Sequence, residues 1–186
     1  YVSEGYVLFI FVFWLYIYLV ERRGFTMMRG GWMTALPWLL AFAVSPLGGI
    51  ACDRLSVRFA ARLAGAKAVI MAGYACSGAL LFLAACARSP WMSVLALALS
   101  LTALMSAESS FWVSAAHLSG DRVGALSGVM NMAGIGGGIA STMLVPILTQ
   151  HYGWLAAFGS GTAMALLCVA LASRLRETRV PPAALT

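Results

Sequence analysis

Residues 48–67 read GGIACDRLSVRFAARLAGAK. Within this stretch lie one acid and four bases: Asp53, Arg54, Arg58, Arg62 and Lys67. The rest of the chain is almost free of charge, because 62% of its 186 residues are hydrophobic and 10% are charged. Soluble domains contain about 50% apolar and about 25% charged residues. The composition therefore indicates a membrane protein, in which a charged stretch is expected where the polypeptide leaves the bilayer.

Long apolar runs lie on both sides of this stretch. A helix needs about 20 apolar residues to cross the hydrocarbon core, and six runs approach or exceed that length: residues 5–20, 31–50, 66–87, 91–117, 123–150 and 154–174. Spanning segments must be helices here, because the alternating segments of about ten residues that mark barrel strands are missing. We predict an all-α membrane protein, a six-transmembrane-helix bundle over residues 1–175, with a cytoplasmic tail over residues 176–186. The short connections predict that consecutive helices are antiparallel neighbours.

The twelve cations divide unevenly between the two sides of this arrangement. Four lie on one side, Arg22, Arg23, Arg29 and Arg88. Eight lie on the other: Arg54, Arg58, Arg62, Lys67, Arg122, Arg174, Arg176 and Arg179. The positive-inside rule then predicts a multi-pass protein of the inner (plasma) membrane with both termini in the cytoplasm. Nucleic acid is not an expected partner, because there is no basic patch on a soluble face.

The remaining composition argues against bound cofactors. Cys52, Cys76, Cys86 and Cys168 occur singly, without the paired spacing of a zinc site or a redox dithiol, and are interpreted as small hydrophobic residues. We predict no cofactor and no metal. The first apolar run lacks the basic segment and the cleavage site of a signal peptide. Because the chain opens on Tyr1, we expect the natural polypeptide to continue upstream.

The fifth apolar run carries regularly spaced small residues. Gly124 and Gly128, then Gly134 and Gly138, are four residues apart, and Asn131 lies between the pairs on nearly the same face. Such spacing lets helices approach closely, so the face either packs against a neighbour or lines a partly polar cavity. The run of glycines in GIGGG, residues 134–138, predicts a loosened helix at mid-depth.

The opening stretch resembles a known signature. Gly49 stands four residues before Asp53, which Arg54 follows directly and Arg58 follows five residues later. This is similar to the G-x-x-x-D-R/K-x-G-R-R/K loop that transporters of the major facilitator superfamily carry between the second and third helices of each half, with Ser56 in place of the second glycine. The match to this signature is incomplete, as in the second copy of the loop, and the chain has six predicted helices. Both features resemble the C-terminal half of that twelve-helix fold. The resemblance implies that Gly49, Asp53, Arg54 and Arg58 form a conformational latch, a cluster of contacts that stabilises one conformation of the transporter.

Three further segments resemble the anion:cation symporter branch of the superfamily. They are FWLYIYLVERRGFT (residues 13–26), where Tyr16 stands in place of a proline, ESSFW (residues 108–112) and LSGVMNMAGIGGGIAST (residues 126–142). The resemblance implies secondary active transport, by proton-coupled symport of a small organic anion such as a sugar acid or carboxylate. It also implies alternating access with an N-terminal six-helix half, in the same polypeptide or in a second chain, within the lipid bilayer.

Candidate site residues come from these segments. Glu108 lies deep in a predicted span, where a charge costs about 2.5–3.5 kcal/mol; it is either a proton-exchanging group or a hydrogen-bonded structural one. Trp112 lies one helical turn further on the same face, and Ser109 flanks it. Asn131 matches a substrate-facing asparagine of the branch, and Tyr16 supplies a hydroxyl near the end of the first span. We predict substrate binding by Asn131, Trp112, Ser109 and Tyr16, and coupling through Glu108.

Two other functions remain as alternatives. The chain could be a half-transporter that pairs with itself or does not transport. A more remote alternative is a rhomboid-like intramembrane serine protease, which also has six helices and a Ser-Gly pair. That reading requires a deeply buried histidine, whereas His117 and His151 lie near the ends of predicted spans. We therefore predict that the protein is not an enzyme.

Overall fold

The computed structural model describes residues 1–175, and the predicted tail (176–186) lies outside that range. The elements in chain order are α1 (Val2–Phe9), η1 (Ile10–Trp14), α2 (Leu15–Ile17), η2 (Tyr18–Arg22), α3 (Met27–Phe59), α4 (Arg62–Cys86), α5 (Pro90–Ser119), η3 (Gly120–Arg122) and α6 (Val123–Ser173). The described chain contains no strand, so the all-α prediction is confirmed. Four helical segments are long and apolar enough to cross a membrane: Val2–Arg22, Met27–Phe59, Arg62–Cys86 and Pro90–Ser173.

The segment Val2–Arg22, here called the first rod, is continuous but irregular. Its two α-helical pieces alternate with two π-helical pieces, η1 and η2. π-Helical turns widen a helix locally and are rare outside functional regions. Tyr16 lies between the two π-helical pieces, at the position where the resembling pattern has proline. The backbone therefore changes from π-helical to α-helical and back to π-helical around Tyr16, although this position carries no proline.

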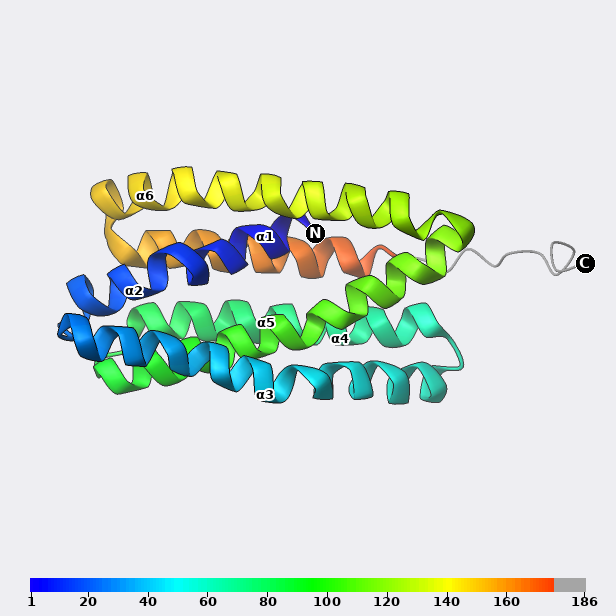
Figure 1. Cartoon of the computed structure of the whole chain (residues 1–186), viewed down its shortest axis with the longest axis horizontal. Helices are drawn as coiled ribbons and strands as arrows, with labels where there is room; N and C mark the ends of the chain where they lie inside the picture. The colour runs from blue at the N-terminus through cyan, green and yellow to red at the C-terminus, as the bar shows by residue number, and fades with distance from the viewer. Residues whose placement is uncertain (176–186) are drawn as a thin grey trace, which may run out of the picture.

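Helix α6 is bent back on itself. Gly153 has φ of 79°, a conformation that glycine adopts without steric cost, and it interrupts the helix between two arms. The first arm (residues 123–152) and the second arm (residues 154–173) run side by side in opposite directions (Figure 1). The sequence prediction of two separate apolar runs on either side of this glycine agrees with the bend.

The order of packing differs from the predicted one. Helix α4 packs against both α3 and α5, as expected for consecutive helices. The first rod, however, packs mainly against α6, and α3 packs extensively against α5 (Figure 1). The prediction that every helix lies beside its sequence neighbour is therefore wrong for the first rod. Short connections limit the distance between helix ends, but the faces that fit closely decide which helices pack along their length.

Glycines explain the contact between α1 and α6. A Cβ atom added to Gly5 would lie 1.8 Å from the carbonyl oxygen of Gly134, and one added to Gly137 would lie 2.0 Å from that of Val2. By contrast, nothing lies within 4 Å of a Cβ added to Gly124 or Gly128. Only the later part of the predicted glycine face is therefore a packing face.

The GIGGG segment remains regular. Helix α6 has helical backbone angles throughout residues 134–138, and Gly153 is its one non-helical position. The predicted loosening at mid-depth is therefore wrong. The close contact with α1 accounts for this regularity, because it supports the glycines on one side.

The charged opening stretch is helical rather than a loop. Helix α3 continues to Phe59, and the turn to α4 consists of Ala60 and Ala61, with Ala60 in the left-handed region at φ of 50°. Between Gly49 and that turn there is neither glycine nor proline to end the helix. The predicted latch residues therefore lie on the last turns of α3.

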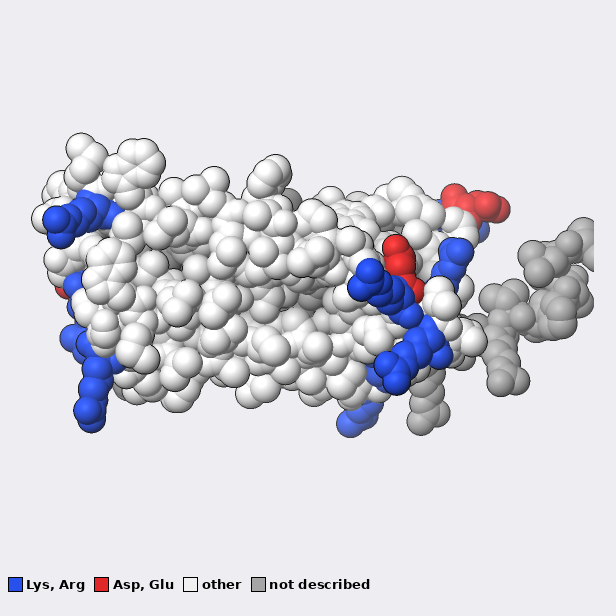
Figure 2. All heavy atoms as spheres, turned by 90° about the horizontal axis from the view of Figure 1, so that it is seen from below, with Lys and Arg blue, Asp and Glu red and all other residues white. Residues whose placement is uncertain are grey.

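On the face that Figure 2 shows, charged side chains gather at the two ends of the helical body, and the surface between them is almost free of charge. Two cations bind helix C-termini, where backbone carbonyls lack helical partners. At one end, Arg23 donates to the carbonyl oxygens of Ala84 and Ala87. At the other, Lys67 Nζ donates to those of Ser173 at 2.6 Å and Leu175 at 3.2 Å. Lys67 therefore caps the C-terminus of α6.

Candidate functional site

A pocket of about 280 Å³ lies between α1, α5 and the first arm of α6. Its polar lining consists of Tyr1, Glu4, Glu108 and Asn131, and apolar side chains and glycines of the same three elements complete it. The pocket therefore combines the two strongest candidates from the sequence, Glu108 and Asn131, which are 23 residues apart on different helices.

Glu108 is the centre of a small hydrogen-bond network. Its Oε1 accepts a hydrogen bond from the indole Nε1 of Trp112 at 2.8 Å and another from the hydroxyl of Tyr1. Its Oε2 is enclosed and has no hydrogen-bond partner within the described chain. The prediction that Glu108 and Trp112 share a face of α5 is confirmed. One oxygen of the carboxyl group is thus held in place, and the other is buried without a partner.

Aromatic rings hold this network from the side. The ring of Tyr1 lies edge-on to Phe111 at 5.3 Å and to Trp112 at 5.9 Å, measured between centroids. Across the pocket, a Cβ on Gly134 would come within 3.0 Å of the Tyr1 ring. The absence of a side chain at Gly134 therefore makes room for Tyr1 next to Glu108. Asn131, one turn earlier on the first arm of α6, lines the pocket and is itself exposed.

The other three predicted substrate-binding residues do not line this pocket, and Trp112 is linked to it only through its hydrogen bond to Glu108. Ser109 faces α3: its Oγ lies 3.8 Å from the position of a Cβ on Gly49, and it has no hydrogen-bond partner in the described chain. Tyr16 lies against Gly30 at the start of α3 and is 39% exposed. It follows the pocket residue Phe9 by seven residues, about 10 Å along a helix. The structure therefore does not bring Ser109 or Tyr16 to the pocket that holds Asn131.

Glu4 is a pocket residue that the sequence analysis missed. Its side chain is only 4% exposed, although the predicted first span began one residue after it. A signal was present, since the predicted run of residues 5–20 is shorter than the roughly 20 residues that a span requires. Extending that run toward the N-terminus would have placed Glu4 inside the membrane with Glu108.

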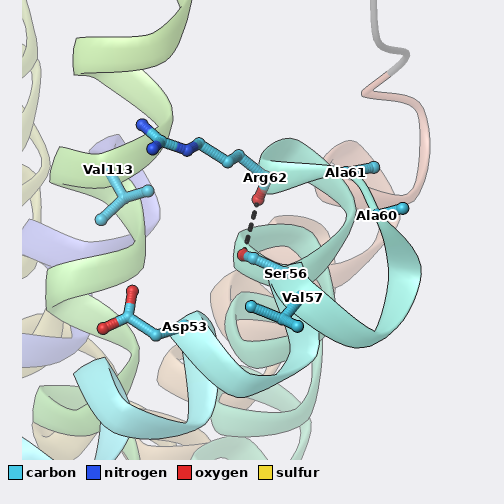
Figure 3. A pocket seen from close by; sticks show the side chains of 7 residues that line it. All are labelled: Asp53, Ser56, Val57, Ala60, Ala61, Arg62 and Val113. Carbon is cyan, nitrogen blue, oxygen red and sulfur yellow. Dashed lines mark hydrogen bonds between the residues drawn. The ribbon is translucent and has the colours of Figure 1, made fainter.

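One of the predicted latch residues, Asp53, borders a second, open pocket of about 560 Å³ at one end of the molecule (Figure 3), whereas Gly49, Arg54 and Arg58 do not line it. The side chains of Asp53 and Arg62 both reach toward Val113 of α5, and the Ser56 hydroxyl donates to the Arg62 carbonyl at 3.3 Å. This pocket therefore combines a carboxylate and a guanidinium from two different helices.

The carboxylate of Asp53 is not paired with either arginine of the predicted latch in the described chain. Neither Arg54 nor Arg58 forms an ion pair with it in residues 1–175. The two arginines lie about 100° and 140° around the helix from Asp53, so they point away from it. The carboxylate of Asp53 is exposed and available to another partner.

Metal chemistry finds no support in the part of the chain that the structure describes, where no three His, Cys, Asp or Glu side chains are grouped so that they could hold a metal ion. The four cysteines are free thiols, two buried and two exposed.

Comparison with known proteins agrees with a transport function. No family model matches the chain. It is 33% identical over 162 residues to a D-galactonate transporter from Escherichia coli, which covers 86% of this chain and 37% of that protein. It is 28% identical over 151 residues to a probable sulfoacetate transporter from Cupriavidus necator, which covers 80% of this chain and 35% of that protein. The chain thus spans about a third of the length of these curated relatives.

The long apolar helices indicate a multi-pass membrane protein, and most of the chain is similar to part of two transporters. The resemblance to transporters is confirmed, because the similarity to two proteins named as transporters extends over most of this chain. Both relatives are named as transporters and not as enzymes.

Proposed function

We propose that this chain is the C-terminal half of a secondary active transporter that moves a small organic anion together with protons across the inner membrane. The relatives support the substrate class, since D-galactonate is a sugar acid and sulfoacetate a small sulfonated carboxylate. A chain that spans about a third of its relatives leaves room in the whole protein for a second bundle of similar size. In this proposal, that bundle is the N-terminal six-helix half.

The topology follows from the two arms of α6. If each arm counts as one span, residues 1–175 cross the membrane six times and return both ends to the same side. The more basic end of the body, which carries Arg54, Arg58 and Arg62, then faces the cytoplasm. The described residues form one transmembrane domain, half of a twelve-helix fold.

The pocket between α1, α5 and α6 is the observation that carries the proposal. It presents the amide of Asn131, which can donate to an anion, beside the Glu108 carboxyl group, which can exchange a proton. Alternating access in this superfamily moves two halves around a site near the membrane midplane. The pocket would form this half's share of that site, and the other half would close it.

The pocket at Asp53 has a second role in this proposal. Its exposed carboxylate and the nearby guanidinium of Arg62 can form interactions with the other half in one conformation and lose them in the next. Such contacts need not be strong, since about 1.4 kcal/mol changes the ratio of two conformations tenfold. Gly49, Arg54 and Arg58 complete the latch on the same end of α3.

Replacing Asn131 with Ala in the full-length protein is expected to reduce the initial rate of uptake at least tenfold, because one or two hydrogen bonds to a charged ligand are worth about 1.5–3 kcal/mol each. The assay measures uptake of labelled D-galactonate and sulfoacetate into cells, normalised to the amount of transporter in the membrane. Met132→Ala is the matched control, since Met132 follows directly and is 73% exposed. Normal uptake by Asn131→Ala at normal abundance would exclude this pocket as the substrate site.

A further inference from the structure

Glu4 is a buried acid without a partner. Its side chain is 96% buried on α1, it lines the pocket, and it forms no hydrogen bond in the described chain. Its Oε2 lies 3.6 Å from the position that a Cβ on Gly134 would occupy, so the carboxyl group reaches the same wall as the Tyr1 ring. A buried carboxyl group with no donor is costly unless it is protonated or binds a cation.

The second acid of the pocket is in a similar state. The Oε2 atom of Glu108 is enclosed without a partner, while its Oε1 is held by Tyr1 and Trp112. Glu4 and Glu108 therefore present two incompletely satisfied carboxyl groups to one space of about 280 Å³. A water molecule occupies about 30 Å³ in the liquid, so this space can hold several waters that relay a proton between them.

The surroundings offer little positive charge. Besides Glu108 on α5, the titratable groups around Glu4 are the phenols of Tyr1 and Tyr74, the latter on α4, and the thiol of Cys168 on the second arm of α6. The first arm contributes Asn131 and Gly134, which do not titrate. The one positive group is the amino group of Tyr1, which would be a neutral amide in a longer polypeptide. Two carboxyl groups that line one pocket repel each other when both carry a charge, so the site favours binding of a positive charge.

We propose that Glu4 and Glu108 form a paired-carboxyl proton site in this half of the transporter. The pair holds one proton: a proton from water on one side of the membrane forms an O–H bond on a carboxyl oxygen, and that bond breaks when the proton passes to water on the other side. The site rests on the proposed function for its coupling role, and it assigns that role to Glu4 together with Glu108.

The first test asks whether the pair titrates, and it does not depend on transport. Infrared difference spectra of the purified full-length protein, recorded across a pH titration, should contain the C=O stretching band of a protonated carboxylic acid. Glu4→Gln and Glu108→Gln should each reduce that band by half or more, and Glu21→Gln, which alters an exposed acid at the end of the first rod, should leave it unchanged. An unchanged band in both pocket variants would overturn the proposal.

The second test asks whether the pair couples transport. In proteoliposomes, the ratio of pH-gradient-driven uptake to counterflow of labelled D-galactonate or sulfoacetate should fall at least tenfold in Glu4→Gln. If the pH gradient drives uptake by the wild type and Glu4→Gln has the same ratio as the wild type, the paired-carboxyl site is overturned and the proposed function stands. Uptake driven by a Na⁺ gradient without a pH gradient would overturn the choice of proton. A wild-type protein that shows no counterflow would count against the proposed function, and the infrared band would then decide on the site alone.

Discussion

Gly48→Ala is expected to destabilise the helical body severely. Gly48 lies where α3 crosses α5, and a Cβ added there would come 1.9 Å from the carbonyl oxygen of Ser106 and 2.6 Å from its carbonyl carbon. Both are backbone atoms, so no side chain can rotate away and the two helices must separate. Overpacking typically costs about 1–3 kcal/mol and sometimes more, and a shift of two long helices falls at the upper end. The midpoint of thermal unfolding in detergent should fall by roughly 6–12 °C.

The next residue supplies the control. A Cβ added to Gly49 has one neighbour within 4 Å, Ser109 Oγ at an ordinary 3.8 Å. Because alanine favours a helix over glycine by about 1 kcal/mol, Gly49→Ala should unfold at the same temperature as the wild type or slightly higher. Static light scattering and a fluorescent thiol probe can both report the midpoint. Equal midpoints for the two alanine variants would contradict the close crossing at Gly48.

The helical class and the membrane setting could be predicted from composition and apolar runs, because lipid permits few other backbone arrangements. Which helices pack together could not. The contact between α1 and α6 depends on Gly5 meeting Gly134, two residues more than a hundred positions apart whose spacing says nothing of their alignment. The charged stretch shows a different limit. Its charges predicted the membrane boundary, yet a helix continues through such a boundary when no residue stops it, as α3 does up to Ala60.

Half of the candidate site could also be predicted. Glu108 and Trp112 follow from helical spacing within one segment, and the hydrogen bond between them confirms it. Asn131 came from a resemblance, and the structure brings it to the same pocket. Tyr16 and Ser109 failed to reach that pocket because their direction depends on the irregular first rod and on the α3 contact, neither of which leaves a sequence pattern. Glu4 was missed because a span boundary was placed one residue too late.

Arg23 forms the most extensive polar contact between the first rod and the rest of the protein. Its guanidinium donates to the carbonyl oxygens of Ala84 at 2.5 Å and Ala87 at 2.7 Å, which lie at the C-terminus of α4. Its Nε donates to the Tyr18 hydroxyl at 2.7 Å, and the Tyr18 hydroxyl also lies 3.0 Å from Ser93 Oγ at the start of α5. Arg23 and the Tyr18 hydroxyl thus join the first rod to the ends of two other helices.

Arg23→Met should therefore lower the free energy of unfolding by about 2–4 kcal/mol, because several hydrogen bonds from a charged donor are lost and the α4 carbonyls regain only water. The melting midpoint should fall by roughly 5–15 °C. Arg23→Lys should recover only part of the loss, since one ammonium group cannot reach both carbonyls in the way a planar guanidinium does. Arg22→Met is the matched control, because Arg22 is exposed and makes no hydrogen bond in the described chain. The expected order of midpoints is wild type and Arg22→Met highest, then Arg23→Lys, then Arg23→Met; a lysine variant as stable as the wild type would reduce the contact to a simple charge at a helix end.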